Sequence, residues 1–104
     1  MNDTLIVIPT YNEIDNVRQI ATAIFRELPA ADILFVDDNS PDGTGQLIDQ
    51  LIKDEPRIHV LHRKEKQGLG RAYIAGFTWA LARHYEFICE MDADFSHAPS
   101  SLPD

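Results

Sequence analysis

The strongest constraint on the fold is a set of short apolar runs that recur along the chain. The runs are continuous rather than alternating, and Ile, Val and Phe are frequent in them. They cover residues 5–8, 33–36, 58–61 and 87–91. Runs of four or five residues with this pattern are typical of strands that are buried on both faces, as in a parallel sheet. We therefore predict buried, parallel strands at these positions.

The segments between the apolar runs have helical periodicity. One apolar stripe runs from Val17 to Leu28, and a shorter stripe covers residues 47–52. A third helix is predicted over residues 70–83, where small residues such as Gly76 allow close approach to a sheet. The order β-α-β-α-β-α-β favours right-handed crossovers and an α/β fold, with an open, mostly parallel sheet flanked by helices.

Composition narrows the classes of function. The chain has 104 residues, with 9 Lys+Arg against 17 Asp+Glu, and a formal charge of −8. This acidic balance argues against nonspecific binding of nucleic acid, so we predict no nucleic-acid partner. The single cysteine, Cys89, excludes an internal disulfide and fits a reducing compartment. No apolar run approaches the roughly 20 residues of a membrane span, so we predict a cytoplasmic protein.

Polar residues follow each predicted strand. In an open parallel sheet, ligands bind at the carboxyl ends of the strands, which all meet at one edge. The carboxylates expected at that edge belong to Glu13, Asp37, Asp38, Asp92 and Asp94. Two carboxylates about 5 Å apart repel each other by roughly 3 kcal/mol at an effective dielectric constant near 20. The cluster therefore indicates a bound cation or a ligand rich in hydroxyl groups.

The pair Asp92 and Asp94 directly follows the fourth apolar run. Two acidic residues at positions i and i+2 offer oxygen ligands to a hard divalent ion that also holds phosphates, so we predict a site for a divalent cation. The alternative is that Asp and Asn simply favour turns, and we prefer that interpretation for Asp42 and Gly43. The four histidines have no metal-ligand spacing.

Several other residues at this edge allow two interpretations. Either carboxylate of Asp37 and Asp38 could accept hydrogen bonds from a ribose or a base, or one of them could cap the following helix or hold the loop. Tyr11 could stack on a base or pack within a turn, and Glu13 could bind a ligand or cap the first helix. The basic loop 62–70 could neutralise a pyrophosphate or be a solvated charge run. No standard glycine-rich phosphate loop follows the first strand.

Four motifs occur in an order that resembles a known family. They cover residues 9–13, 36–44, 68–74 and 91–97. Together they resemble the inverting family 2 glycosyltransferases with a GT-A fold, and within that family the dolichyl-phosphate (polyprenyl-phosphate) mannosyltransferases. The Asp-x-Asp motif alone is a weak signal. The Ser-Pro-Asp-Gly-Thr string combined with Gly-Leu-Gly-x-Ala-Tyr-Ile is more specific to this subgroup.

The resemblance implies a GT-A domain, a Rossmann-like fold that binds nucleotide-diphospho-sugars. Residues 1–104 would form the nucleotide-sugar-binding half, and the acceptor half would be absent. The implied reaction is transfer of mannose from GDP-mannose to dolichyl or polyprenyl phosphate, with inversion at the anomeric carbon and a Mg²⁺ or Mn²⁺ ion. Peripheral attachment to the cytoplasmic face of the membrane is also implied. We predict that this chain alone transfers little or no sugar.

The resemblance also assigns roles to individual residues. The nucleotide pocket would be lined by Pro9, Tyr11, Glu13, Val36 and Asp38. Asp92, Ala93 and Asp94 would meet the ribose and the diphosphate, and Asp92 and Asp94 would be the catalytic and metal-binding residues. Some relatives have a metal ligand at the position of Ser96, but a serine hydroxyl is a weaker ligand.

Two other classes of protein fit some of these features. A haloacid-dehalogenase-like phosphatase also has a strand that leads into Asp-x-Asp, with Asp92 as nucleophile and Asp94 as acid and base. Against this alternative, that motif normally follows the first strand and here follows the fourth. The other alternative is a non-catalytic fragment that binds a nucleotide or a metal.

Overall fold

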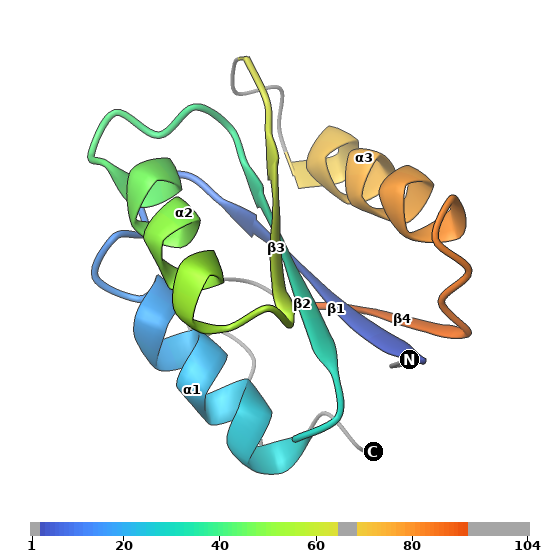
Figure 1. The fold of residues 1–104 in the computed structure, drawn as a ribbon. Helices are drawn as coiled ribbons and strands as arrows, with labels where there is room; N and C mark the ends of the chain where they lie inside the picture. The colour runs from blue at the N-terminus through green and yellow to red at the C-terminus, as the bar shows by residue number, and fades with distance from the viewer. Residues whose placement is uncertain (1–2, 65–68, 92–104) are drawn as a thin grey trace.

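The computed structural model describes residues 3–64 and 69–91 and contains a parallel sheet with helices on both faces (Figure 1). The elements are β1 (Thr4–Thr10), α1 (Val17–Glu27), β2 (Asp32–Asp37), α2 (Thr44–Asp54), β3 (Ile58–His62), α3 (Leu69–Leu81) and β4 (Phe87–Glu90). Helices α1 and α2 cover one face of the sheet, and α3 covers the other. This order of elements confirms the predicted α/β fold.

The strands of the described sheet lie in the order β3-β2-β1-β4, and all neighbours are parallel. Strands β1 and β2 are therefore central. In their register Pro9 lies opposite Val36, and Thr10 lies opposite Asp37. The carboxyl ends of these two strands are thus level with each other, so the loops that follow them start side by side.

The prediction that all strands are buried on both faces is right for β1 and β2 and wrong for β3 and β4. Residues 5–8 and 33–36 are completely buried. By contrast, β3 is mostly half-buried, and Phe87 of β4 is 60% exposed. Within the described sheet, β3 and β4 each have one neighbouring strand. A continuous apolar run does not distinguish an edge strand from a central one, because it encodes hydrophobicity and not the number of neighbours.

Alternate residues of the central strands supply two hydrophobic clusters, because successive side chains of a strand point to opposite faces. Ile6 and Phe35 belong to the cluster under α1 and α2. Val7 and Val36 belong to the cluster under α3. Both faces of β1 and β2 are therefore packed, which fixes the sheet as a rigid base for the loops at its edges.

Helix α3 approaches the sheet through small residues, as predicted. Ala72, Gly76 and Ala80 recur every four residues and are buried. A Cβ atom at position 76 would lie 2.5 Å from Cγ1 of Val7, which is closer than two non-bonded carbon atoms approach. Glycine is therefore required at this crossing.

The element boundaries differ slightly from those predicted. Strand β1 continues through Pro9 and Thr10, and β4 ends at Glu90, although the Met91 amide still donates a hydrogen bond to the carbonyl oxygen of Val7 (3.0 Å). Helix α3 ends at Leu81, two residues before the predicted end. Among helices in the described ranges, none has the length and hydrophobicity of a membrane span.

Candidate functional site

The loops that follow β1 and β2 are joined by hydrogen bonds at the carboxyl edge of the sheet. Three successive backbone amides of the first loop donate to side chains of the second. These bonds connect Asn12 N to Ser40 Oγ (3.0 Å), Glu13 N to Thr44 Oγ1 (3.0 Å) and Ile14 N to Asp42 Oδ2 (3.2 Å). Two motifs that are separate in the sequence therefore form one structural unit.

Asp37, the last residue of β2, holds this unit together. The residue is 2% exposed. Its Oδ1 accepts hydrogen bonds from Thr10 Oγ1 (2.7 Å) and Ser40 Oγ (2.6 Å), and its Oδ2 accepts one from the Ser40 amide (3.1 Å). Of the two interpretations of the Asp37–Asp38 pair, holding the loop is therefore confirmed for Asp37.

Asp38 has a different environment. Its amide donates to the carbonyl oxygen of Thr10 (3.1 Å), which extends the contact between the two strands by one residue. Its carboxylate forms an ion pair with Arg63, with Oδ1 3.5 Å from Nη1. The two side chains are 7% and 14% exposed, respectively. Arg63, from the basic loop after β3, thus lies against the carboxylate that we predicted to bind a nucleotide.

Asp42 has the turn function that we preferred for it. Its Oδ1 accepts from the Thr44 amide (2.9 Å) and from the Thr44 hydroxyl, and Gly43 between them has a φ of +94°. Burial raises the pKa of Asp42, but the hydrogen bonds from Thr44 and from the Ile14 amide outweigh it and lower the pKa below its ordinary value. The carboxylate is therefore held in its ionised form.

Two asparagines shape the same loops, and we did not single them out from the sequence. Asn12 and Asn39 each lie two residues beyond the end of a central strand, with φ of +57° and +56°. Asn tolerates this left-handed conformation better than most residues other than Gly. The Asn39 side chain also donates to the carbonyl oxygen of Lys64 (3.1 Å), which connects the loop after β2 to the loop after β3. An Asn two residues after the end of each central strand was a signal in the sequence from which these turns could have been predicted.

The predicted nucleotide-binding residues of the first two loops lie at one edge, with different exposure. Tyr11 is 37% exposed, and Glu13 is half-buried. Glu13 accepts a hydrogen bond from the Asn16 side chain (2.9 Å) and does not cap α1 through its own side chain. Pro9 and Val36 are buried, Val36 completely, so their place in a nucleotide pocket stays a prediction.

The predicted metal and catalytic residues lie outside the described residues. These are Asp92, Ala93, Asp94 and Ser96. Across residues 3–64 and 69–91, no group of three or more His, Cys, Asp or Glu side chains is arranged to hold a metal. Strand β4 runs parallel to β1 as its direct neighbour, so the described chain leaves β4 in the direction of the edge that carries Tyr11 and Asp38.

Solved structures with the same arrangement of strands and helices identify the fold. "Crystal structure of S. aureus TarS 1-349" matches with a TM-score of 0.74 and 20% identity, covering 90% of this chain and 28% of that chain. "Mannosyltransferase PcManGT from Pyrobaculum calidifontis in complex with GDP-Man and Mn2+" matches with a TM-score of 0.67 and 20% identity, covering 74% of this chain and 24% of that chain. At these identities the likeness concerns the fold, which is that of the GT-A glycosyltransferases.

The family follows from the sequence comparisons. The model of "Glycosyl transferase family 2" matches residues 5–104, and the chain belongs to this family. It is 54% identical over 100 residues to "Polyprenol monophosphomannose synthase" of Mycolicibacterium smegmatis, covering 95% of this chain and 38% of that protein. It is 52% identical over 99 residues to "Undecaprenyl-phosphate mannosyltransferase" of Micrococcus luteus, covering 95% of this chain and 41% of that protein. The chain thus spans about two fifths of the length of these relatives.

Proposed function

We propose that this chain forms the donor-nucleotide half of an inverting mannosyltransferase that transfers mannose from GDP-mannose to dolichyl or polyprenyl phosphate. The observation that carries the proposal is the 54% identity, over 95% of the chain, to a protein named as a polyprenol monophosphomannose synthase. The solved mannosyltransferase of the same fold is in complex with GDP-Man and Mn²⁺, which supports the choice of donor. The family match gives no support to the phosphatase alternative.

The joined loops are suited to hold the nucleotide. The carboxylate of Asp38 would accept hydrogen bonds from the base or the ribose, and Arg63 beside it would fix the direction of that carboxylate. Tyr11 offers an exposed ring on which a base could stack. Asp37 would act as a positioning residue, because it orders the loop that carries Asp38 without being exposed itself.

The chemistry requires few protein groups. A phosphate oxygen of the acceptor attacks the anomeric carbon from the face opposite GDP, the bond from that carbon to the GDP oxygen breaks, and the configuration inverts. A phosphate monoester is largely ionised near neutral pH, so no protein general base is needed. Asp92 and Asp94, with Ser96 as a weaker ligand, would hold a Mg²⁺ or Mn²⁺ ion, and such an ion neutralises charge on a leaving diphosphate.

The acceptor is a lipid phosphate, which places the reaction at a membrane surface. We therefore include peripheral association with the cytoplasmic face of the membrane in the proposal. The chain of 104 residues would bind the donor nucleotide and transfer little or no mannose, because it spans about two fifths of the relatives' length. Detectable mannose transfer by this chain alone would contradict that part of the proposal.

Calorimetric titration of the chain with GDP and UDP, with and without Mn²⁺, tests the proposal. We expect GDP to bind more tightly than UDP and the binding to depend on the metal. Asp38→Asn should weaken GDP binding about tenfold or more, because a hydrogen bond to a charged group contributes about 1.5–3 kcal/mol. Asp94→Ala should remove the metal-dependent part.

The matched control is Asp54→Asn, a change of the same kind at an exposed position at the end of α2. It should leave GDP affinity unchanged. A folded chain that binds no nucleotide, or an Asp38→Asn variant that binds GDP like the unaltered chain, would contradict the proposal. Trapping a phosphoaspartate at Asp92 would instead support a phosphatase.

A further inference from the structure

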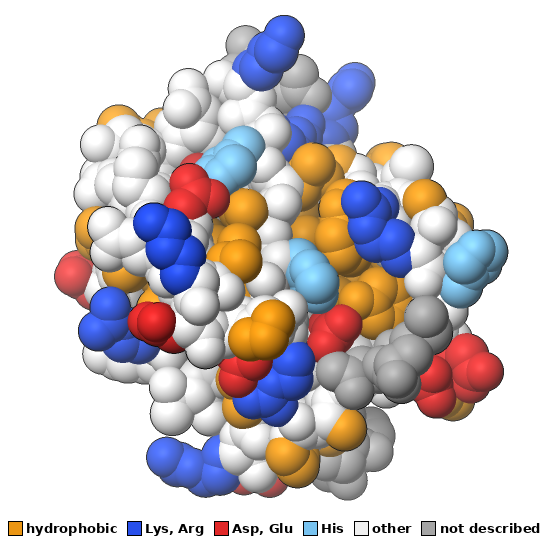
Figure 2. All heavy atoms as spheres, in the orientation of Figure 1, with side chains coloured by type: hydrophobic (Ala, Val, Ile, Leu, Met, Phe, Trp, Pro, Cys, Tyr) orange, Lys and Arg blue, Asp and Glu red, His pale blue; other side chains and the backbone are white. Residues whose placement is uncertain are grey.

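A hollow lies near the amino ends of β2 and β3, at the edge of the sheet opposite the carboxyl edge that carries Tyr11 and Asp38. Its volume is about 650 Å³, within the range of roughly 300–1,000 Å³ that is usual for small-molecule sites. The side chains that matter for its chemistry are Asp32, Arg57, His59, Trp79, Arg83 and Tyr85. Figure 2 views this face, and histidine, Lys or Arg, and hydrophobic side chains gather there between α2 and α3.

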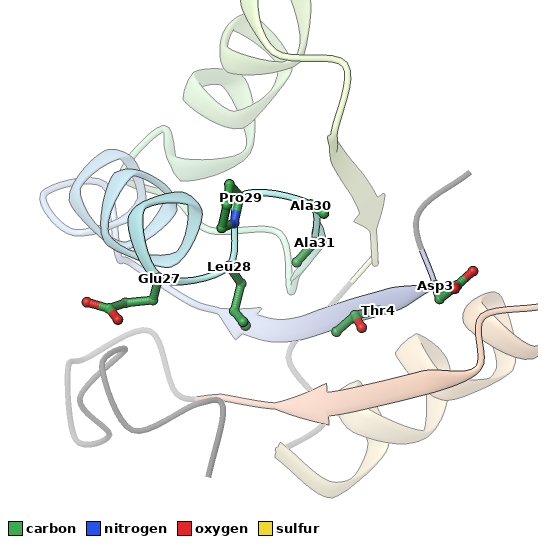
Figure 3. Close-up of a pocket in the computed structure, with 7 residues that line it drawn as sticks. All are labelled: Asp3, Thr4, Glu27, Leu28, Pro29, Ala30 and Ala31. Carbon is green, nitrogen blue, oxygen red and sulfur yellow. The ribbon is translucent and has the colours of Figure 1, made fainter.

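A smaller hollow beneath the turn before β2 is a useful contrast. It has a volume of about 350 Å³ and is lined by residues 27–31 together with Asp3 and Thr4. The carboxylates of Asp3 and Glu27 lie at opposite ends of it and point away from each other (Figure 3). It therefore brings no charged groups together, whereas the larger hollow does.

One wall of the larger hollow is fixed by hydrogen bonds around Asp32. Oδ2 of Asp32 accepts a hydrogen bond from the Tyr85 hydroxyl and lies 3.4 Å from Nε2 of His59. The Asp32 side chain is 14% exposed. Burial, followed by the hydrogen bond to Asp32, raises the pKa of Tyr85, so its hydroxyl remains a donor at neutral pH. These contacts join β2, β3 and the segment before β4, so the wall is preorganised.

The other wall is aromatic and centres on Trp79. Its ring stacks on Tyr85, with centroids 6.3 Å apart and planes at 19°, and is tilted against His59 at 5.2 Å. The guanidinium of Arg83 lies 3.9 Å from the centroid of the Trp79 ring. Flat rings on this wall favour a flat apolar ligand, because such surfaces pack at van der Waals distance over a large area.

The two arginines that line the hollow, Arg57 and Arg83, differ in the interactions that they already make within the chain. Arg57 pairs with Glu55, donates to the carbonyl oxygen of Pro29, and lies over the ring of Phe25. Exposed Arg83 also lies over a ring, that of Trp79, and donates a hydrogen bond to the carbonyl oxygen of Trp79 (3.0 Å). Unlike Arg57, it forms no ion pair with a carboxylate in the described part of the chain. A guanidinium has five N–H donors in a fork that matches a carboxylate. Arg83 is therefore the group suited to bind an anion.

We propose that this hollow binds a small aromatic carboxylate, with its ring against Trp79 and His59 and its carboxylate on Arg83. The nearby negative charge of Asp32 repels a dianion such as a phosphate monoester more strongly than it repels a carboxylate with a single negative charge. The site is separate from the donor edge and does not depend on the proposed transferase function.

Trp79 is the single tryptophan of the chain, so its fluorescence reports directly on this hollow. The chain is titrated with benzoate, with benzamide as a neutral analogue, and with cyclohexanecarboxylate as a non-aromatic one. We expect a saturable change with benzoate and at least tenfold weaker binding of both analogues. Addition of GDP should not displace benzoate.

Arg83→Ala should weaken benzoate binding at least tenfold and leave benzamide binding unchanged, since an uncharged ligand gains little from the guanidinium. Arg83→Lys keeps the positive charge but lacks the forked guanidinium. Its affinity for benzoate should therefore lie between that of the unaltered chain and that of Arg83→Ala. Arg26→Ala, an exposed arginine on α1, is the matched control and should bind benzoate normally. No saturable change with benzoate, or equal binding by Arg83→Ala and the unaltered chain, would overturn the proposal.

Discussion

The two ends of strand β2 carry the same residue type, aspartate, in different surroundings. The strand begins with Asp32 and ends with Asp37, and both carboxylates accept hydrogen bonds from hydroxyl groups. Asp37 is 2% exposed, and its partners are short side chains that close the loops around it. Asp32 has large aromatic partners, Tyr85 and His59, which leave a hollow beside them. In this strand, the aspartate with short partners lies in a closed surface, and the aspartate with large aromatic partners lines an opening.

Removal of the Asp37 carboxylate should have the largest effect on stability. Asp37→Ala leaves the hydroxyls of Thr10 and Ser40 and the Ser40 amide without their acceptor. Each buried group that loses its partner costs about 1–3 kcal/mol, and three groups lose theirs, so we expect a loss of about 3 kcal/mol or more. Urea unfolding followed by circular dichroism measures this loss. Asp54→Ala, at an exposed position, should change stability by less than about 0.5 kcal/mol.

A stability loss below about 1 kcal/mol for Asp37→Ala would contradict the role assigned to Asp37. If that variant does not fold, Asp37→Asn serves instead, because its remaining oxygen still accepts from Thr10 and Ser40. Asp37→Asn should also weaken GDP binding, since the Ser40 amide then faces another N–H donor and the loop of Asp38 shifts.

The corresponding change at the other end of β2 should cost less. Asp32→Ala removes the acceptor of Tyr85 and the partner of His59, but this wall is partly open to water, which satisfies the groups left behind. We expect a loss of about 1–2 kcal/mol by the same urea measurement. GDP affinity should not change, because Asp32 lies at the opposite edge of the sheet. A GDP affinity that falls as much in Asp32→Ala as in Asp37→Asn would remove the distinction between the two ends.

The raised pKa of Tyr85 predicts a loss of stability at alkaline pH. Its pKa is raised in the folded state, first by burial and then by the hydrogen bond to Asp32. The contribution to stability is therefore complete below the unfolded pKa of about 10 and is lost as the pH rises above that value. The free energy of unfolding should fall as the pH rises from about 10 to 12, by less than the roughly 1.4 kcal/mol per pH unit of a fully protected group. Tyr85→Phe should have a shallower fall; identical profiles would contradict the assignment.

The smallest effect is expected at acid pH from Asp42. Its pKa is lowered in the folded state, because the hydrogen bonds from Thr44 and Ile14 outweigh the effect of burial. Its contribution is present above the unfolded pKa of 3.8 and is lost as the pH falls through the lower, folded value. Asp42→Asn should therefore flatten the acid limb of the stability profile between pH 4 and 2 in urea titrations. A steeper acid limb in the variant would contradict this sign.

The central part of the fold was predictable because it depends on local hydrophobicity. The runs at 5–8 and 33–36 predicted β1 and β2, and the small residues of α3 predicted its close packing. The exposure of β3 and β4 was not predictable, because the number of neighbouring strands is a property of the whole sheet. Some element ends also differ from the predicted ones by one or two residues. For example, the Met91 amide is paired to Val7 although β4 ends at Glu90.

The location of the candidate site was predictable from the sequence, but the roles of its individual residues were less so. Parallel strands imply that Tyr11 and Asp38, which directly follow β1 and β2, lie at the same edge of the sheet, and they do. The division of work between Asp37 and Asp38 depends on which side chain faces Thr10 and which faces Arg63, and residue types alone do not encode this. The contact between Asp32 and Tyr85 joins residues 53 positions apart and left no local pattern. The roles of Asp92 and Asp94 stay predictions.

The hydrogen bonds between loops 12–14 and 40–44 have a consequence for how such proteins change over evolutionary time. A substitution at Ser40 or Thr44 alters the anchor of a backbone segment about thirty positions earlier, so neither loop is free to vary alone. Transplanting only one of them between relatives should produce a mismatched chimera, whereas exchanging both together should preserve the hydrogen bonds between them. We therefore expect the two loops at this edge to change together.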